Sequence, residues 1–168
     1  TGNRNVYVMN PDQTVTFSGG ISEGIYGSCY LHKLGPGTLE LTGENTYSGT
    51  TYGAYDGGTL VLRGNGTLPN TNSLEIRQAG RLKIVNTAGN NFERIADLAR
   101  VYLVGGTFEF QAASGLVPSS ETVGSLEIAG GTSGSIVSDS NGGTAILKFA
   151  QIAPVPAGAG FNFVAKGS

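Results

Sequence analysis

A short motif recurs six times along the chain at a nearly constant spacing. Each copy begins with a glycine and continues in most cases with Thr or Ser, and four of the six copies then alternate apolar with polar residues. The first large apolar residues stand at positions 39, 60, 82, 108, 126 and about 146, so the steps are about 21, 22, 26, 18 and 20 residues. The copies are Gly37–Leu41, Gly58–Leu62, Gly80–Ile84, Gly106–Phe110, Gly124–Ile128 and Gly143–Leu147. A strand-like unit that returns at this distance indicates stacked structural repeats.

The repeat distance selects one all-β architecture over the others. A sandwich or barrel places turn signals every ~8–12 residues, with hairpin turns between paired strands. One turn of a β-solenoid takes ~20 residues or slightly more and holds two or three short strands. The motif therefore predicts an all-β parallel β-helix of about six or seven coils, with residues 1–168 as a single module.

The alternation within each copy predicts which side chains form the core. Successive side chains of a strand point to opposite faces, so the apolar positions are expected inside and the polar positions outside. The expected outer residues are Val61, Lys83, Glu109 and Glu127. The expected core residues are Leu60, Leu62, Leu82, Ile84, Phe108, Phe110, Leu126 and Ile128. Phe92–Arg100 has apolar residues at helical spacing, and is expected to form either a helical turn or an irregular corner.

Composition excludes several classes of protein. The 28 glycines lack the every-third-residue period of collagen. A net charge of -2 with scattered basic residues argues against a nucleic-acid partner. No apolar run is long enough to span a bilayer, so no membrane insertion is expected. The single cysteine, Cys29, cannot form an internal disulfide and is expected to be a small buried residue.

The residue types needed for catalysis or metal binding do not gather in any motif. Glu109 and Glu127 would meet the spacing of a glycosidase pair if they stacked on neighbouring coils, but outward glutamates are more often solvated. The only histidine, His32, lacks a Gly-x-Ser-x-Gly partner, and with Cys29 it provides too few ligands for zinc. The sequence therefore predicts a non-enzymatic protein without catalytic, cofactor-binding or metal-binding residues.

Residues 34–49, which read Leu-Gly-Pro-Gly-Thr-Leu-Glu-Leu-Thr-Gly-Glu-Asn-Thr-Tyr-Ser-Gly, resemble the autotransporter-associated β-strand repeat, also called the passenger-associated transport repeat. Gly57–Leu60 continues the likeness, and residues 94–99, 104–108 and 120–126 are similar to segments of giant repetitive proteins of this family. The resemblance implies a right-handed β-helix, secretion, and a place on the bacterial cell surface. It implies no catalytic residues and no cofactor.

Two segments depart from the family pattern and carry tyrosines. Thr50–Gly57 is longer than the usual link, and Glu23–His32 is extended where the family is compact. Tyr26, Tyr30, Tyr52 and Tyr55 are therefore expected in loops. There they either contact a neighbouring module or a ligand, such as a host or matrix glycan, or lie flat over the rod and cover apolar surface.

Both ends of the chain are strand-like and lack a polar cap. Val6, Tyr7 and Val8 stand at one end, and Phe161, Phe163 and Val164 stand at the other. Solenoids expose unpaired backbone at their ends, so the chain is expected either to come from a longer array or to join copies end to end. The predicted function is a structural or adhesive module of a secreted fibre. The alternatives are a carbohydrate-binding or carbohydrate-cleaving β-helix and a spacer that promotes transport.

Overall fold

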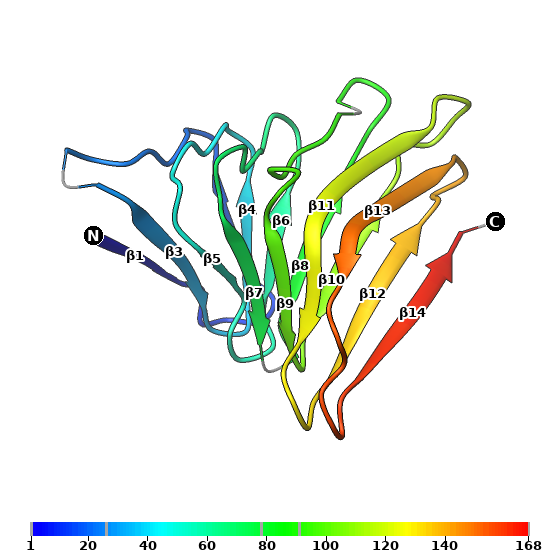
Figure 1. Ribbon diagram of the computed structural model, residues 1–168. Helices are drawn as coiled ribbons and strands as arrows, with labels where there is room; N and C mark the ends of the chain where they lie inside the picture. Colours follow the sequence, from blue (N-terminus) through cyan, green and yellow to red (C-terminus); the bar gives the residue numbers. More distant parts are fainter. Residues whose placement is uncertain (1, 26, 78, 91, 168) are drawn as a thin grey trace.

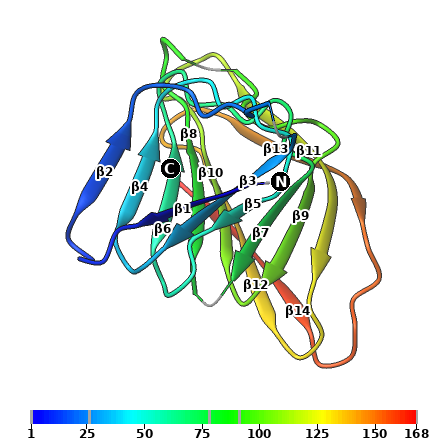
Figure 2. The same cartoon turned by 90° about the vertical axis from the view of Figure 1, so that its left-hand side faces the viewer.

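The computed structural model describes residues 2–25, 27–77, 79–90 and 92–167, and these residues form strands and turns without a helix (Figure 1). The strands alternate along the chain between two parallel sheets of seven strands each (Figures 1 and 2). Sheet A contains β1 (Gly2–Tyr7), β3 (Cys29–Leu34), β5 (Thr51–Gly53), β7 (Ser73–Arg77), β9 (Arg100–Val104), β11 (Ser119–Ile128) and β13 (Ala145–Ile152). Sheet B contains β2 (Thr14–Phe17), β4 (Thr38–Leu41), β6 (Thr59–Leu62), β8 (Arg81–Val85), β10 (Thr107–Gln111), β12 (Ser133–Asp139) and β14 (Gly160–Lys166).

One strand from each sheet makes one coil, and the coils stack into a β-solenoid of about six turns. The prediction of a parallel β-helix is therefore confirmed. Figure 1 shows the two chain termini at opposite ends of the stack. In sheet B, the partners of successive coils are Val15, Leu39, Leu60, Leu82, Phe108, Ile136 and Phe163. Each of these positions therefore adds one rung to an apolar ladder that runs along the rod.

The last two copies of the sequence motif belong to the other sheet. Leu126 pairs with Val101 in sheet A, and Ile146 pairs with Ser120 there, whereas the next rung above Phe108 is Ile136. The prediction that all six copies stack on one another is therefore wrong. Both sheets have the same buried-exposed alternation, so a glycine followed by that pattern does not tell which sheet a strand joins.

The motif glycines are required because successive coils approach each other closely. A Cβ atom on Gly80 would lie 1.6 Å from the carbonyl oxygen of Ala54, and one on Gly58 would lie 2.2 Å from that of Gly35. The preceding Gly57 has a φ of 78°, which glycine adopts without strain. In this Gly-Gly pair, the first glycine allows the positive φ of the turn, and the second allows the backbones of two successive coils to lie close together.

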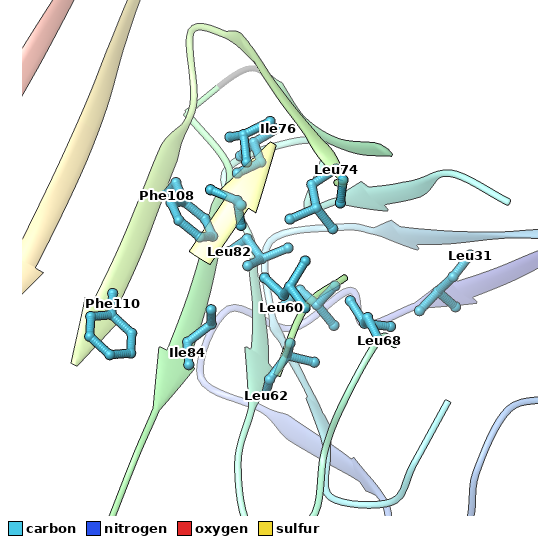
Figure 3. Packing of buried hydrophobic residues seen from close by; sticks show 14 of the residues in the cluster. Leu31, Leu60, Leu62, Leu68, Leu74, Ile76, Leu82, Ile84, Phe108 and Phe110 are labelled. Atoms are coloured by element: carbon cyan, nitrogen blue, oxygen red, sulfur yellow. The ribbon is translucent and has the colours of Figure 1, made fainter. Parts of the chain in front are cut away.

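The core lies between the two sheets and matches the predicted inner face. All eight residues expected inside are buried, and Figure 3 shows six of them packed against side chains from sheet A. The eight buried residues are Leu60, Leu62, Leu82, Ile84, Phe108, Phe110, Leu126 and Ile128. Burial of one such side chain contributes about 1.5–3 kcal/mol, so these ladders are the main source of stability.

Two of the residues expected in solvent are covered instead. Val61 and Glu109 lie on the outer face of sheet B but are only 7% and 3% exposed. Glu109 forms ion pairs with Arg81 and with the Nζ atom of Lys83, the latter at 3.2 Å. Burial alone would raise the pKa of Glu109, but the two cations outweigh it and hold the pKa below its usual value. The alternation predicts which face of the sheet a side chain points to. It does not predict whether long side chains nearby will cover it.

Phe92–Arg100 forms an irregular corner, so the helical alternative is wrong. Ile95 makes an isolated parallel bridge with Leu68 of the preceding coil. The backbone of this segment bonds across coils: Leu68 N–H donates to Arg94 C=O at 2.6 Å, and Ala96 N–H donates to Leu68 C=O at 3.1 Å. In an α-helix, the Arg94 C=O and the Ala96 N–H would instead have bonded to backbone groups within the same segment.

A buried arginine holds this corner together. Arg94 is 1% exposed, and its guanidinium donates to the carbonyls of Gly64 at 2.7 Å, Gly66 at 2.9 Å and Asn90 at 2.9 Å. Its Nε atom donates to Asn86 Oδ1 at 2.6 Å. One side chain therefore satisfies four acceptors from two successive turns of the chain.

Glu121 of β11 supports the same corner from the next coil. Its carboxylate accepts the backbone N–H groups of Arg94 and Ile95, each at 2.9 Å. Burial raises the pKa of Glu121 to about 8, although the two N–H donors act in the opposite direction. The carboxyl therefore favours its neutral form at neutral pH.

We expect the pH dependence of stability to report on Glu121. Its pKa is higher in the folded chain than its unfolded value of 4.5, so its stabilising contribution is full below pH 4.5 and is lost as the pH rises to about 8. Between pH 5 and 8 the wild type should lose up to about 1.4 kcal/mol of unfolding free energy per pH unit relative to Glu121→Gln. Urea unfolding at pH 5, 6.5 and 8 measures this difference.

Glu44→Gln is the matched control, because Glu44 is an exposed carboxylate on the same side of the solenoid. Its pH profile should follow that of the wild type. Parallel profiles for Glu121→Gln and the wild type would show that Glu121 does not titrate in this range.

Candidate interaction surfaces

The structure places two of the four predicted tyrosines on strands. Tyr30 lies on β3 and Tyr52 lies on β5, so the prediction that they lie in loops is wrong, while Tyr55 lies in the turn that follows β5. Tyr26 lies outside the described residues. The strands begin within the two long segments because inward-facing Cys29, Leu31 and Thr51 are buried, as a core strand requires.

Tyr30, His32, Tyr52 and Tyr55 form an aromatic cluster on the outer face of sheet A. The ring centroids of His32 and Tyr52 are 4.2 Å apart, and those of Tyr30 and Tyr52 are 6.5 Å apart. His32 and Tyr55 are nearly parallel, with an interplanar angle of 4° at 6.5 Å. All four side chains are half-buried, so the rings support one another and still face solvent.

Polar groups border the aromatic cluster on both sides. On β1, Asn3 is the register partner of Tyr30 and Asn5 is the partner of His32, and both asparagines are exposed. On β7, Glu75 is the partner of Tyr52 and forms an ion pair with Arg77. The Arg77 guanidinium also lies 5.6 Å from the Tyr55 ring centroid, a cation–π contact that fixes the edge of the cluster.

The electrostatics of the cluster leave it nearly uncharged at neutral pH. Burial lowers the pKa of His32 below its usual value, and the charge of Glu75 offsets only part of this effect. Burial raises the pKa of Tyr55, with Arg77 acting against it. The imidazole and phenol are therefore neutral, and the nearby charges of Glu75 and Arg77 cancel.

The two glutamates weighed as a catalytic pair are not neighbours. Glu109 lies on β10 in sheet B and Glu127 lies on β11 in sheet A. The idea that they stack on adjacent coils is therefore wrong. Glu127 instead contacts Arg100 of its own sheet at 3.4 Å.

A separate groove of about 1250 Å³ crosses the corner side of the solenoid. Its lining includes Glu44, Glu93, Asp97 and Phe92, so carboxylates and one aromatic ring do meet there. Carbohydrate hydrolysis also needs a carboxylic acid that keeps its proton near neutral pH. Glu121 has such a raised pKa, but it lies fully buried with both oxygens bonded to backbone, out of reach of a substrate.

The described residues contain neither a metal-binding cluster nor a membrane-spanning helix. No group of three or more His, Cys, Asp or Glu side chains among them could hold a metal ion. The same residues contain no helix with the length and hydropathy to cross a bilayer. Cys29 is buried, as expected, with its Sγ atom 4.0 Å from the Ser22 carbonyl oxygen.

Comparison with known families gives one match. The family model of the passenger-associated transport repeat matches residues 31–52. The match covers 22 of the 168 residues of the chain. A search of curated proteins and a search of solved structures each found no match.

The passenger-associated transport repeat corresponds to one turn of the solenoid. It runs from Leu31 on β3 through β4 to Tyr52 on β5, and Leu31 is the register partner of Thr51. Within the repeat, Tyr47 is fully buried, and its hydroxyl lies 2.6 Å from Thr51 Oγ1. The match therefore covers about one turn of the β-solenoid, and the other turns lie outside it.

The length of the matched segment accounts for the contact between two members of the aromatic cluster. His32 and Tyr52 stand at its two ends and meet because one turn brings them into register. The lack of catalytic and zinc-binding partners left His32 without an expected role, and its contact with Tyr52 was not predicted. The spacing of Tyr30 and His32 on one strand face was the available signal, whereas their register with Tyr52 depends on coil length.

The N-terminal end of the solenoid exposes strands β1 and β2. Among the residues predicted for end contacts, Tyr7 is 63% exposed and Val6 is half-buried. Val8 lies just beyond β1 and is buried, with its N–H donating to Leu34 C=O at 2.9 Å. Tyr7 and Val6 therefore remain available at this end, while Val8 belongs to the first coil.

The C-terminal end exposes a hollow in the core. A cavity of about 480 Å³ lies between the last strands and is lined mainly by apolar side chains. Phe163 points into this end and is 58% exposed, while Phe161 and Val164 are half-buried. The other lining residues are Ile136, Ser138, Ala145, Ile146, Leu147, Phe149, Val164 and Ala165.

Proposed function

We propose that the chain is a structural, non-enzymatic module of a secreted bacterial surface protein, which extends an extracellular fibre by packing end to end on further β-helical coils. The observation that carries the proposal is the open C-terminal end, where both sheets stop beside an apolar hollow. The passenger-associated transport repeat supports secretion and a surface location.

The strand edges at this end suit another parallel coil. β13 and β14 each pair with one strand on their inner side, and within the described chain nothing pairs with their outer side. Such an edge presents a row of N–H and C=O groups that a further strand can satisfy. The exposed Phe163 and Ile152 add apolar surface that a next coil would bury.

The strands at the opposite end have matching properties. β1 and β2 are the first members of the same two sheets, and they also pair on one side only within the described residues. Both sheets are parallel throughout, so a copy placed on the C-terminal end can continue each ladder in the same direction. The contact is head-to-tail, and repeated use of it builds a filament.

The substitution Phe163→Glu tests this packing by placing a charge in the hollow. We expect the wild-type chain to self-associate with increasing concentration in sedimentation velocity, and to form rods in electron micrographs. Phe163→Glu should raise the concentration needed for association by at least about tenfold, because a buried aromatic contact is replaced by an unpaired charge.

Leu116→Glu is the matched control, because Leu116 is fully exposed on the loop between β10 and β11. It should associate like the wild type. The proposal is wrong if the wild type stays monomeric at high concentration, or if Leu116→Glu impairs association as strongly as Phe163→Glu.

A further inference from the structure

The aromatic cluster begins one strand in from the N-terminal end of sheet A, and its four side chains are not among those proposed for end-to-end packing. Its residues lie on the outer face of β3 and β5 and in the turn after β5, and the amides of Asn3 and Asn5 lie beside it on β1. We propose that this face binds a neutral polysaccharide chain, with Tyr52 and His32 as the stacking platform and Asn3 and Asn5 as hydrogen-bonding groups.

The rings supply the apolar half of such a site. A sugar ring has C–H groups on its faces and hydroxyl groups on its rim, so it needs a flat apolar surface bordered by polar groups. The ring centroid of Tyr52 lies 4.2 Å from that of His32, 6.3 Å from that of Tyr55 and 6.5 Å from that of Tyr30. The four rings therefore make one continuous aromatic surface. Because the rings hold one another in place, little conformational entropy is lost when a ligand binds.

The two asparagines supply the polar half. A side-chain amide offers a donor and an acceptor together, which suits a pair of neighbouring hydroxyl groups. Asn3 and Asn5 are two residues apart on β1 and so lie on the same face, in register with Tyr30 and His32. Both are exposed, and their amides can bind a ligand without breaking the sheet.

The charge of the face favours a neutral ligand. Arg77 is paired with Glu75 and stacks on Tyr55, so its charge is compensated within the protein. A nucleic acid or an acidic glycan would need uncompensated cations along its path. The rings come from adjacent strands about 4.8 Å apart, so a bound chain would run along the rod axis from β1 to β5.

Affinity electrophoresis tests the proposal with four soluble neutral polysaccharides: hydroxyethyl cellulose, laminarin, mannan and dextran. At least one should retard the wild-type chain, and heparin should retard it less. Tyr52→Ala should weaken the retarding interaction about tenfold, the effect expected when a central aromatic contact is lost. Asn5→Ala, at an exposed position that leaves the sheet intact, should weaken it several-fold.

Tyr102→Ala is the matched control, because Tyr102 lies on the same outer face two strands away from Tyr52 and stacks under Arg100 at 4.9 Å. It should change the affinity less than twofold. The proposal is overturned if none of the four polysaccharides retards the wild type, if heparin retards it more strongly, or if Tyr102→Ala weakens binding as much as Tyr52→Ala. Tyr52→Ala leaves both terminal strands unchanged, so it should not alter association through the ends, and the two proposals fail separately.

Discussion

Arg94→Ala should lower the free energy of unfolding by about 3 kcal/mol or more. The guanidinium is almost completely buried and donates four hydrogen bonds, to the carbonyls of Gly64, Gly66 and Asn90 and to the Asn86 side chain. Each acceptor that loses its partner without gaining water costs about 1–3 kcal/mol. Water entering the space left by Arg94 can restore some of these bonds, so the loss should stay below the full sum.

Chemical denaturation of the purified chain measures the change, and Arg63→Ala is its control. Arg63 also contacts one acceptor group, Glu40 at 3.0 Å, but its side chain is 54% exposed. An exposed ion pair contributes at most about 1 kcal/mol, so Arg63→Ala should have a small effect. Equal effects of the two substitutions would show that the corner is held by its backbone alone.

Phe108→Ala should destabilise the chain by about 3–5 kcal/mol, the range measured for loss of a buried aromatic side chain. Phe108 is fully buried and is the rung of the sheet B ladder between Leu82 and Ile136. It also packs edge-to-face against Phe149 of sheet A, with ring centroids 6.5 Å apart. Truncation would therefore open a cavity that both sheets line, and neither sheet can move in to fill it.

Leu98→Ala is the control for this prediction, because Leu98 is 89% exposed and its loss should change stability by less than about 0.5 kcal/mol. Thermal and urea unfolding of the two variants provide independent measurements. A loss below 1 kcal/mol for Phe108→Ala would mean that the core can repack around a missing ring, in conflict with the tight packing of protein interiors.

The sequence predicted the architecture because the alternation of apolar and polar residues is local. Leu60 and Leu62 point inward wherever their coil lies, and the spacing of 21 to 26 residues between the first four motif copies follows the coil length. The assignment of Leu126 to the same ladder failed because strands of both sheets share one pattern. Sheet membership is set by where the intervening corner directs the chain, and this depends on contacts between coils.

The aromatic cluster and the Arg94 corner show the same limit. Tyr30, Tyr52 and Tyr55 stood out by residue type, but their assembly with His32 requires the register between β3 and β5. In the sequence, Arg94 is one of several scattered basic residues. Only the fold brings the carbonyl groups of Gly64 and Gly66, from the preceding turn, within hydrogen-bond distance of its guanidinium. Interactions between residues more than 20 positions apart carry no local signature in the chain.

Each strand pairs with the strand one coil before it, at a separation of 20 to 28 residues along the chain. Closing a loop of this length has a modest entropic cost, and the cost is the same at every step. A polypeptide that emerges gradually from a narrow pore can therefore fold turn by turn as it appears. Each completed turn gives the following segment a template, and no segment must wait for a distant part of the chain.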